Sequence, residues 1–299
     1  MTQSGQTENT GTIKTPKELV SGAVRLVSLP EVCIRVNQML EDPEVSANEL
    51  GRVLSQDTGL TARLLKIVNS SFYGFPSRVE TVSRAVTIIG LRELRGLVMA
   101  ASAIETFSRI PTDILNMAQF WRHSVYCGVV AQLLAERCHV LHSERLFVAG
   151  LLHDIGKLII CNRMPQLARD IHNQLKHNKE LDFIIERKVL GFDHAEVGGE
   201  LLSTWNMPQA LCDAVFFHHL PGQTKQSKIE VALVHIANSI TGTVEAELDN
   251  PDEVLIQPIE TSCWETTNLD ESIIDEIKFE AAEHFRDALE LVVPRGTYE

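Results

Sequence analysis

The chain has 299 residues, of which 44% are hydrophobic, and its formal net charge at pH 7 is −13. This length and hydrophobic content suit one large or two medium globular domains. Acidic side chains are in excess and no cluster of lysines and arginines is present, which argues against nucleic-acid binding, because phosphate backbones require such clusters. No apolar stretch is long enough to span a membrane, so we expect a cytoplasmic protein without a membrane partner.

Apolar residues recur three or four positions apart along nearly the whole chain, which predicts an all-α fold. The first 15 residues are polar and are expected to form a disordered leader. Ser46 and Glu49 match a capping box, while Asp57 and Gly90 mark further helix boundaries. The segment 244–267 contains prolines and is expected to be irregular. The expected helices are 19–27, 33–40, 46–54, 60–68, 82–89, 91–103, 120–136, 143–160, 165–177, 181–190, 193–203, 208–219, 229–242 and 270–291.

The helices 82–89 and 91–103, joined by Gly90, have the form of a DNA-binding helix-turn-helix. The second of them offers only Arg92 and Arg95 to a phosphate backbone and is otherwise apolar. Helix pairs that simply pack against each other are far commoner, so we favour packing over DNA binding.

Six polar side chains are distributed over the apolar helices that follow residue 120: His123, His153, Asp154, His194, His218 and His219. Burying imidazoles and a carboxylate costs free energy unless another group pairs with them, and a bound metal ion is the usual partner. His153 and Asp154 combine nitrogen and oxygen ligands, a mixture that suits iron, manganese or zinc. Each signal also has a structural explanation: His123 as a boundary histidine bonded to a carbonyl, and His218 and His219 as partners of a helix dipole.

Lys157 follows His153 by one helical turn, so the two side chains are expected on the same helix face. A lysine at this place could hold a phosphoryl oxygen as a point charge. The alternative is an ordinary exposed lysine near a helix C-terminus. Asp193 precedes His194 in an acid-x-x-Glu pattern, which predicts that Asp193 caps a helix whose first turn carries His194.

In their order along the chain, these residues and their surroundings resemble the HDOD group (HD-related output domain) of bacterial signalling proteins, within the HD superfamily of metal-dependent phosphohydrolases. The resemblance covers roughly residues 16–245. The matching stretches are residues 57–70, 85–90, 120–124, 150–158, 191–198, 205–208 and 217–219.

The resemblance implies an all-helical fold, in which an N-terminal helical subdomain packs on an HD-type helical bundle. By position, His123, His153 and Asp154 correspond to the ligands of the primary HD metal. His194, His218 and His219 correspond to the additional histidines of the related HD-GYP cyclic-dinucleotide phosphodiesterases, so one or two divalent ions are expected. The chain would then divide into a leader (1–15), an N-terminal helical part (16–110), an HD-like bundle (111–245) and a C-terminal extension with the final helix (246–299).

Two departures from the catalytic relatives bear on function. The residues after His219 lack the GYP signature, and Asn238 stands where those relatives carry an aspartate. An amide oxygen can coordinate a metal ion, but it brings no charge and is a weak ligand. His235, one turn earlier on the same helix, is expected to support the site from the core rather than to bind the metal.

These departures favour a regulatory, non-catalytic signalling protein with a retained metal-binding pocket, whose partner is a signalling protein or a small phosphorylated ligand. The alternative is a metal-dependent phosphohydrolase or phosphodiesterase that acts on a nucleotide or a cyclic dinucleotide, with Lys157 in contact with the phosphate. The final helix, 270–291, is expected to pack back onto the bundle, and a homodimer contact is the alternative for its apolar stripe.

Overall fold

The computed structural model describes residues 15–26, 31–42, 44–69, 73, 75, 77–107, 110–248 and 255–292. Within these ranges the chain forms α-helices and one short 3-10 turn, and it contains no strand, which confirms the all-α prediction. The leader expected over residues 1–15 lies almost wholly outside the described residues. None of the described helices is both long enough and apolar enough to cross a bilayer.

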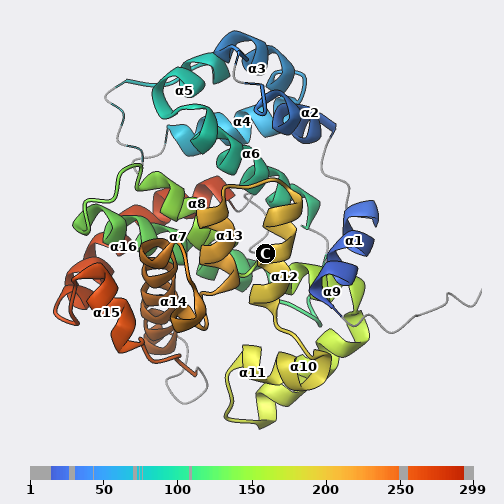
Figure 1. Cartoon of the computed structure of the whole chain (residues 1–299), viewed down its shortest axis with the longest axis vertical. Coiled ribbons are helices and arrows are strands. Elements are labelled where there is room, and N and C mark those ends of the chain that lie inside the picture. Colours follow the sequence, from blue (N-terminus) through green and yellow to red (C-terminus); the bar gives the residue numbers. More distant parts are fainter. Residues whose placement is uncertain are drawn as a thin grey trace, which may run out of the picture.

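The N-terminal group consists of α2–α6 and forms the upper part of the molecule in Figure 1. The Ser46 side chain accepts from the Glu49 backbone and the Glu49 side chain accepts from the Ser46 backbone, so the predicted capping box is present. Asp57 caps the next helix, as predicted. The last helix of the group, α6, packs against four other helices and is an element of the core. The bounds are α2 (Glu31–Met39), α3 (Ala47–Leu54), α4 (Thr58–Val68), α5 (Val82–Ile89) and α6 (Leu91–Thr106).

The larger bundle is built around α7, whose side chains are buried over most of its length. Gly150 of α8 faces Gly128 of α7, and a Cβ atom on Gly150 would lie 2.6 Å from the Gly128 Cα atom. The two helices therefore approach more closely than larger residues would allow. α1 packs against α9 and α12 of this bundle rather than with α2–α6. The bounds are α1 (Pro16–Leu26), α7 (Met117–Arg137), α8 (Glu144–Leu152), α9 (Ile155–Arg163), α12 (His194–Thr204), α13 (Gln209–Phe216) and α14 (Lys228–Leu248).

The remaining helices lie on the outside of the bundle (Figure 1). α16 packs on α7, with an edge-to-face contact between Tyr126 and Phe285 and ion pairs from Arg137 to Glu276 and Glu280. The final helix therefore packs back onto the bundle, as predicted. The bounds are α10 (Pro165–His177), α11 (Asp182–Leu190), α15 (Thr261–Thr267) and α16 (Ile273–Val292).

Two predictions about helix boundaries were wrong. The single helix expected over 143–160 is two helices, because the chain leaves helical geometry at Asp154 (φ −95°, ψ 5°) and changes direction. Apolar spacing continues through the break, so the periodicity alone does not show it. The segment 244–267 is not irregular throughout, since α14 continues to Leu248 and α15 is helical. Its polar residues carry little apolar pattern, yet they are compatible with a helix.

Candidate metal centre

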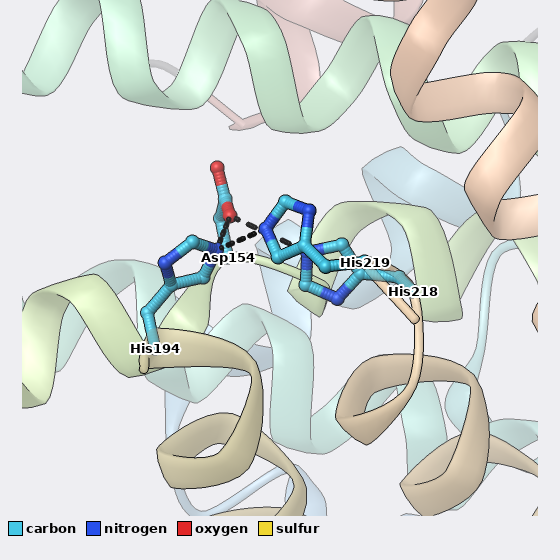
Figure 2. A group of neighbouring side chains, drawn as sticks. All are labelled: Asp154, His194, His218 and His219. Carbon is cyan, nitrogen blue, oxygen red and sulfur yellow. Dashed lines mark hydrogen bonds and ion pairs between the residues drawn. The ribbon is translucent and has the colours of Figure 1, made fainter. Parts of the chain in front are cut away.

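The polar series predicted from the sequence converges at one place in the bundle. His123 comes from the second turn of α7, His153 and Asp154 from the break between α8 and α9, and His194 is the first residue of α12. The His218–His219 pair follows α13, where a turn ends that helix. The side chains of Asp154, His194, His218 and His219 point toward one another in Figure 2. All of the series is buried except His123, whose side chain is 18% exposed.

Asp154 lies at the centre and belongs to two groups of ligand-type atoms, in each of which the atoms are within 4.8 Å of one another. Its Oδ1 atom is 2.9 Å from His194 Nε2 and 4.0 Å from His218 Nε2. Its Oδ2 atom is 3.5 Å from His153 Nε2 and 3.9 Å from His123 Nε2. The first group is Asp154, His194, His218 and His219, and the second is His123, His153 and Asp154.

Each histidine of the site uses its Nδ1 atom for a contact on the outside of the cluster. The acceptors are backbone carbonyl, side-chain amide or carboxylate oxygens, none of which can donate, so Nδ1 carries a proton and Nε2 faces inward. The hydrogen bonds of the outer nitrogens therefore fix the orientation of all five imidazole rings. The pairs are His123 with Glu245 (2.9 Å), His153 with the Gly150 carbonyl (2.6 Å), His194 with Glu186 (2.6 Å), His218 with the Val215 carbonyl (2.7 Å) and His219 with Gln257 (2.7 Å).

The inward-facing atoms fit a bound metal ion. His153 Nε2 and His218 Nε2 are buried and have no hydrogen-bond partner among the described residues. Each such atom costs about 1–3 kcal/mol when it is left unsatisfied, and coordination of an ion would remove that cost. His194 Nε2 lies 2.9 Å from His219 Nε2. This separation is close to that of two nitrogen ligands at right angles around an ion with bonds of about 2.1 Å.

The protonation states of the deepest histidines also suit a metal. Burial lowers the pKa of His153 to about 4 and that of His219 to about 3, and it lowers the pKa of His218 strongly as well. These rings are therefore neutral at pH 7, the state that coordination requires. Burial also acts to lower the pKa of His123 and His194, but nearby carboxylates outweigh it and raise both values.

Lys157 lies in the first turn of α9 and is not an exposed lysine at a helix C-terminus. Its side chain is 23% exposed, and its Nζ atom is 2.9 Å from Asp154 Oδ2 and 2.6 Å from Asp182 Oδ2. Burial acts to lower the pKa of Lys157, but the two carboxylates outweigh it and raise the pKa above its ordinary value. Lys157 therefore pairs with the Asp154 carboxylate at the centre of the cluster and with the Asp182 carboxylate at the same time.

The helix expected over 181–190 is present as α11, but the sequence did not predict that its residues Asp182, Phe183 and Glu186 lie over the cluster. The Phe183 ring stacks on the His219 ring, with centroids 4.3 Å apart and planes at 15°. Glu186 accepts hydrogen bonds from the backbone N–H of His194 and from its ring, at 2.7 Å and 2.6 Å. The sequence carried no clear signal for this role, because Glu186 is followed directly by Arg187 and Lys188 and resembles part of an ordinary charged helix face.

Two residues of α14 complete the surroundings. Asn238 Oδ1 lies 3.0 Å from His123 Nε2, so the amide faces the cluster. His235 faces elsewhere: its Nδ1 atom donates to the His218 carbonyl at 2.7 Å, and its Nε2 atom accepts from the Glu260 backbone N–H at 3.1 Å. His235 thus fixes the backbone of His218, which agrees with a supporting role. The predicted cap by Asp193 on α12 is also present.

The HDOD domain family matches residues 26–221 of the chain. An uncharacterized protein of Treponema pallidum is 26% identical over 222 residues, which cover 73% of this chain and 42% of that protein. The cyclic di-GMP phosphodiesterase CdgJ of Vibrio cholerae is 24% identical over 191 residues, which cover 56% of this chain and 43% of CdgJ. This chain thus spans less than half the length of either relative.

The fold is shared with the crystal structure of an HDOD domain protein of unknown function from Geobacter sulfurreducens. The TM-score is 0.68 at 24% identity, and the similarity covers 93% of this chain and 98% of that one. At this identity the likeness concerns the fold alone. The family match extends over more than half of the sequence, and the chain therefore belongs to the HDOD domain family.

Proposed function

We propose that this chain is a regulatory HDOD module of bacterial signal transduction, with a metal-binding pocket that turns over no phosphodiester. One or two divalent ions, iron, manganese or zinc, would be held by the six residues of the polar series, with Asn238 as a weak additional ligand. The input would come from a signalling protein or a small phosphorylated ligand in the cytoplasm. A bound ion supplies cross-links between helices and, in a catalytic relative, the polarisation of a water molecule.

The ion-binding part of the proposal is supported by the unpartnered buried atoms around Asp154. The candidate ligands come from α7, the α8–α9 break, α12 and the turn after α13, so ions in the two ligand groups would together join four separate parts of the bundle. The presence or loss of the ion would change how these helices pack, which is a physical route from ligand to partner surface.

The observation that carries the regulatory part is the environment of Lys157. A phosphoryl group needs a cation to receive it, and here Asp182 Oδ2 lies 2.6 Å from the Lys157 amine. The neutral amide of Asn238 faces the cluster where a carboxylate would support the charge of a reacting centre. Both features favour a signalling role over hydrolysis.

The alternative function, a metal-dependent phosphohydrolase or phosphodiesterase, has one observation in its favour. The two groups of ligand atoms share Asp154, an arrangement suited to a pair of ions that clamp a phosphate. CdgJ is named a cyclic di-GMP phosphodiesterase, but this chain matches only 43% of it, so the activity of CdgJ supports the alternative only weakly.

Metal analysis combined with hydrolysis assays tests the proposal. We expect purified wild-type protein to hold stoichiometric iron, manganese or zinc, and Asp154→Ala and His153→Ala to lose most of it. His177→Ala, which changes an exposed histidine at the end of α10, should keep the metal and serves as the matched control. Circular dichroism checks that each variant is folded.

The same samples are then tested on cyclic dinucleotides, nucleotides and a generic phosphodiester. No metal-dependent turnover is expected in the wild type. Hydrolysis that disappears in Asp154→Ala would replace the regulatory proposal with the enzymatic alternative. Equal metal content in wild type and Asp154→Ala would contradict the metal site itself.

A further inference from the structure

His123 lies between two residues of α14, and each of them contacts one nitrogen of its ring. Glu245 Oε2 is 2.9 Å from Nδ1, and Asn238 Oδ1 is 3.0 Å from Nε2. A carboxylate oxygen only accepts hydrogen bonds, so Nδ1 carries a proton and donates to Glu245. The nitrogen that faces the shared aspartate is therefore Nε2, which lies 3.9 Å from Asp154 Oδ2.

The ligand group that contains His123 is poor in negative charge. Among its ligand-type atoms it has one carboxylate, Asp154, and that residue also belongs to the other group. Glu245 brings a second carboxylate to the outer side of the His123 ring. Its side chain is only 16% exposed, and its Oε1 atom is buried without a hydrogen-bond partner in the described parts of the chain. Such a carboxylate is costly to bury unless positive charge balances it; the charge of Arg122 acts on Glu245, and an ion on the far side of the His123 ring would add to it.

The five histidines of the centre differ in what their outer nitrogens contact. Three of them donate to neutral oxygen atoms of backbone carbonyls or a side-chain amide. His123 and His194 instead donate to the carboxylates of Glu245 and Glu186. Each of the two ligand groups therefore contains one histidine with a carboxylate behind it.

A carboxylate bonded to the outer nitrogen fixes the tautomer and orientation of a ligating histidine and makes the inner nitrogen more basic. We propose that Glu245 is a positioning residue of this centre, which orients His123 and supplies negative charge to the ion through its ring. The inference rests on the proposed metal site. It extends that site to a residue beyond the segment 26–221 that matches the HDOD family.

The test compares metal affinities of variants in the full-length chain, measured with Mn²⁺ and Zn²⁺ by competition against a chelator. Glu245→Gln keeps an oxygen that can accept from Nδ1 but removes the charge. We expect its affinity to fall on the order of 10-fold and that of Glu245→Ala toward 100-fold, the range found for such outer partners.

Glu247→Gln is the matched control, because it makes the same chemical change on the same helix. Glu247 is 60% exposed and pairs with Lys278 at 2.7 Å, away from the centre. Its metal affinity should equal that of the wild type. The absorption spectrum of the Co²⁺-loaded protein should shift in Glu245→Gln and stay unchanged in Glu247→Gln, since only the former changes the outer hydrogen bond of His123.

Two further measurements separate a positioning role from a merely structural one. Adding Asn238→Asp to Glu245→Gln should restore much of the affinity, because it returns a negative charge on the inner side of His123. Urea unfolding of the metal-free proteins shows whether the variants fold. A Glu245 that only joins α7 to α14 would lower the stability of metal-free Glu245→Gln and leave its metal affinity unchanged.

The outcomes distinguish this inference from the function on which it rests. If the wild type binds metal and Glu245→Gln binds it equally tightly, the positioning role is wrong and the metal site stands. If the wild type binds no metal, the proposed site is wrong and the role of Glu245 is wrong with it.

Discussion

Asp154 is the residue on which both ligand groups depend. Its Oδ1 atom faces His194 and His218, while its Oδ2 atom faces His153 and Lys157. Burial acts to raise the pKa of Asp154, but the positive charges of Lys157 and His194 and the hydrogen bond from His194 act against it, and the pKa lies well below its usual range. The carboxylate is therefore ionised at neutral pH, and one substitution at this position disturbs every ligand around it.

Asp182 forms an ion pair with the Lys157 amine, the cation that a phosphate would need. Removing the charge of Asp182 should free that amine. We expect Asp182→Asn to bind inorganic phosphate more tightly than the wild type, on the order of tenfold, because a hydrogen bond to a charged group contributes about 1.5–3 kcal/mol. Isothermal titration calorimetry with phosphate measures the difference.

The matched control for this prediction is Glu180→Gln, two residues earlier, where the carboxylate pairs with Lys188 at 2.6 Å. It should bind phosphate as the wild type does. Combining Asp182→Asn with Lys157→Met should abolish the gain. Phosphate affinities that are equal in wild type and Asp182→Asn would show that Asp182 does not compete for Lys157.

The position of α9 against α12 decides whether the ligands meet, because Asp154 precedes one helix and His194 begins the other. Gly156 makes this approach possible: a Cβ atom there would lie 2.0 Å from the His194 carbonyl oxygen and 2.8 Å from the Gly198 nitrogen. Both neighbours are backbone atoms, so they cannot move without shifting a helix. The separation of α9 and α12, and with it the geometry of the candidate ligands, therefore depends on the absence of a methyl group at Gly156.

Gly156→Ala should therefore destabilise the protein by about 1–3 kcal/mol, the usual cost of overpacking, despite the better helix propensity of alanine. Its metal content should fall as well, because α9 and α12 must move apart. Urea denaturation and metal analysis measure the two effects.

Gly59→Ala is the control for the glycine change, since a Cβ atom at Gly59 of α4 would meet nothing closer than 3.5 Å. Its stability should be unchanged or rise by up to about 1 kcal/mol. If both alanine variants were as stable as the wild type, the close approach at Gly156 would not limit the packing of α9 on α12.

The N-terminal group contacts the bundle where α12 is joined to α13. Arg95 of α6 donates to the Asn206 carbonyl at 2.8 Å, and Asn37 of α2 donates to the Trp205 carbonyl at 2.9 Å. The Asn206 side chain in turn donates to Glu41 at 2.9 Å. A cavity of about 310 Å³, lined in part by Arg95 and Asn206, lies at this junction. This cavity borders the connection between α12, which starts with His194, and α13, which precedes His218 and His219. The N-terminal group and the bundle therefore meet at the ends of two helices whose opposite ends carry candidate ligands.

Arg95→Met should weaken this junction while keeping the apolar length of the side chain. The lost bond is partly exposed, so we expect the free energy of unfolding to fall by about 1 kcal/mol. Amide exchange of residues 205–207 should become faster, because the connection loses its partner on α6. Arg84→Met, an exposed arginine on α5, is the control and should leave both quantities unchanged. Identical exchange in the two variants would show that Arg95 does not hold the connection.

Much of the fold could be predicted because its signals lie within one or two helical turns. The spacing of apolar residues, the capping box at Ser46 and Glu49 and the cap at Asp193 are all interactions between near neighbours. The ordered series of histidines and Asp154 could also be recognised as a candidate site, because polar residues in apolar helices require a partner where the helices pack together.

The sequence by itself determined the all-helical architecture, most helix positions and which side chains converge on one centre. Only the tertiary structure decided the break at Asp154, the cover formed by α11 and the carboxylates behind His123 and His194. The reason is physical: the bond from His123 to Glu245 joins residues 122 positions apart, so it exists only after α7 and α14 have packed. A local sequence pattern indicates that a polar side chain will be buried and will need a partner. Only the packing of helices that are distant in the sequence determines which group becomes that partner.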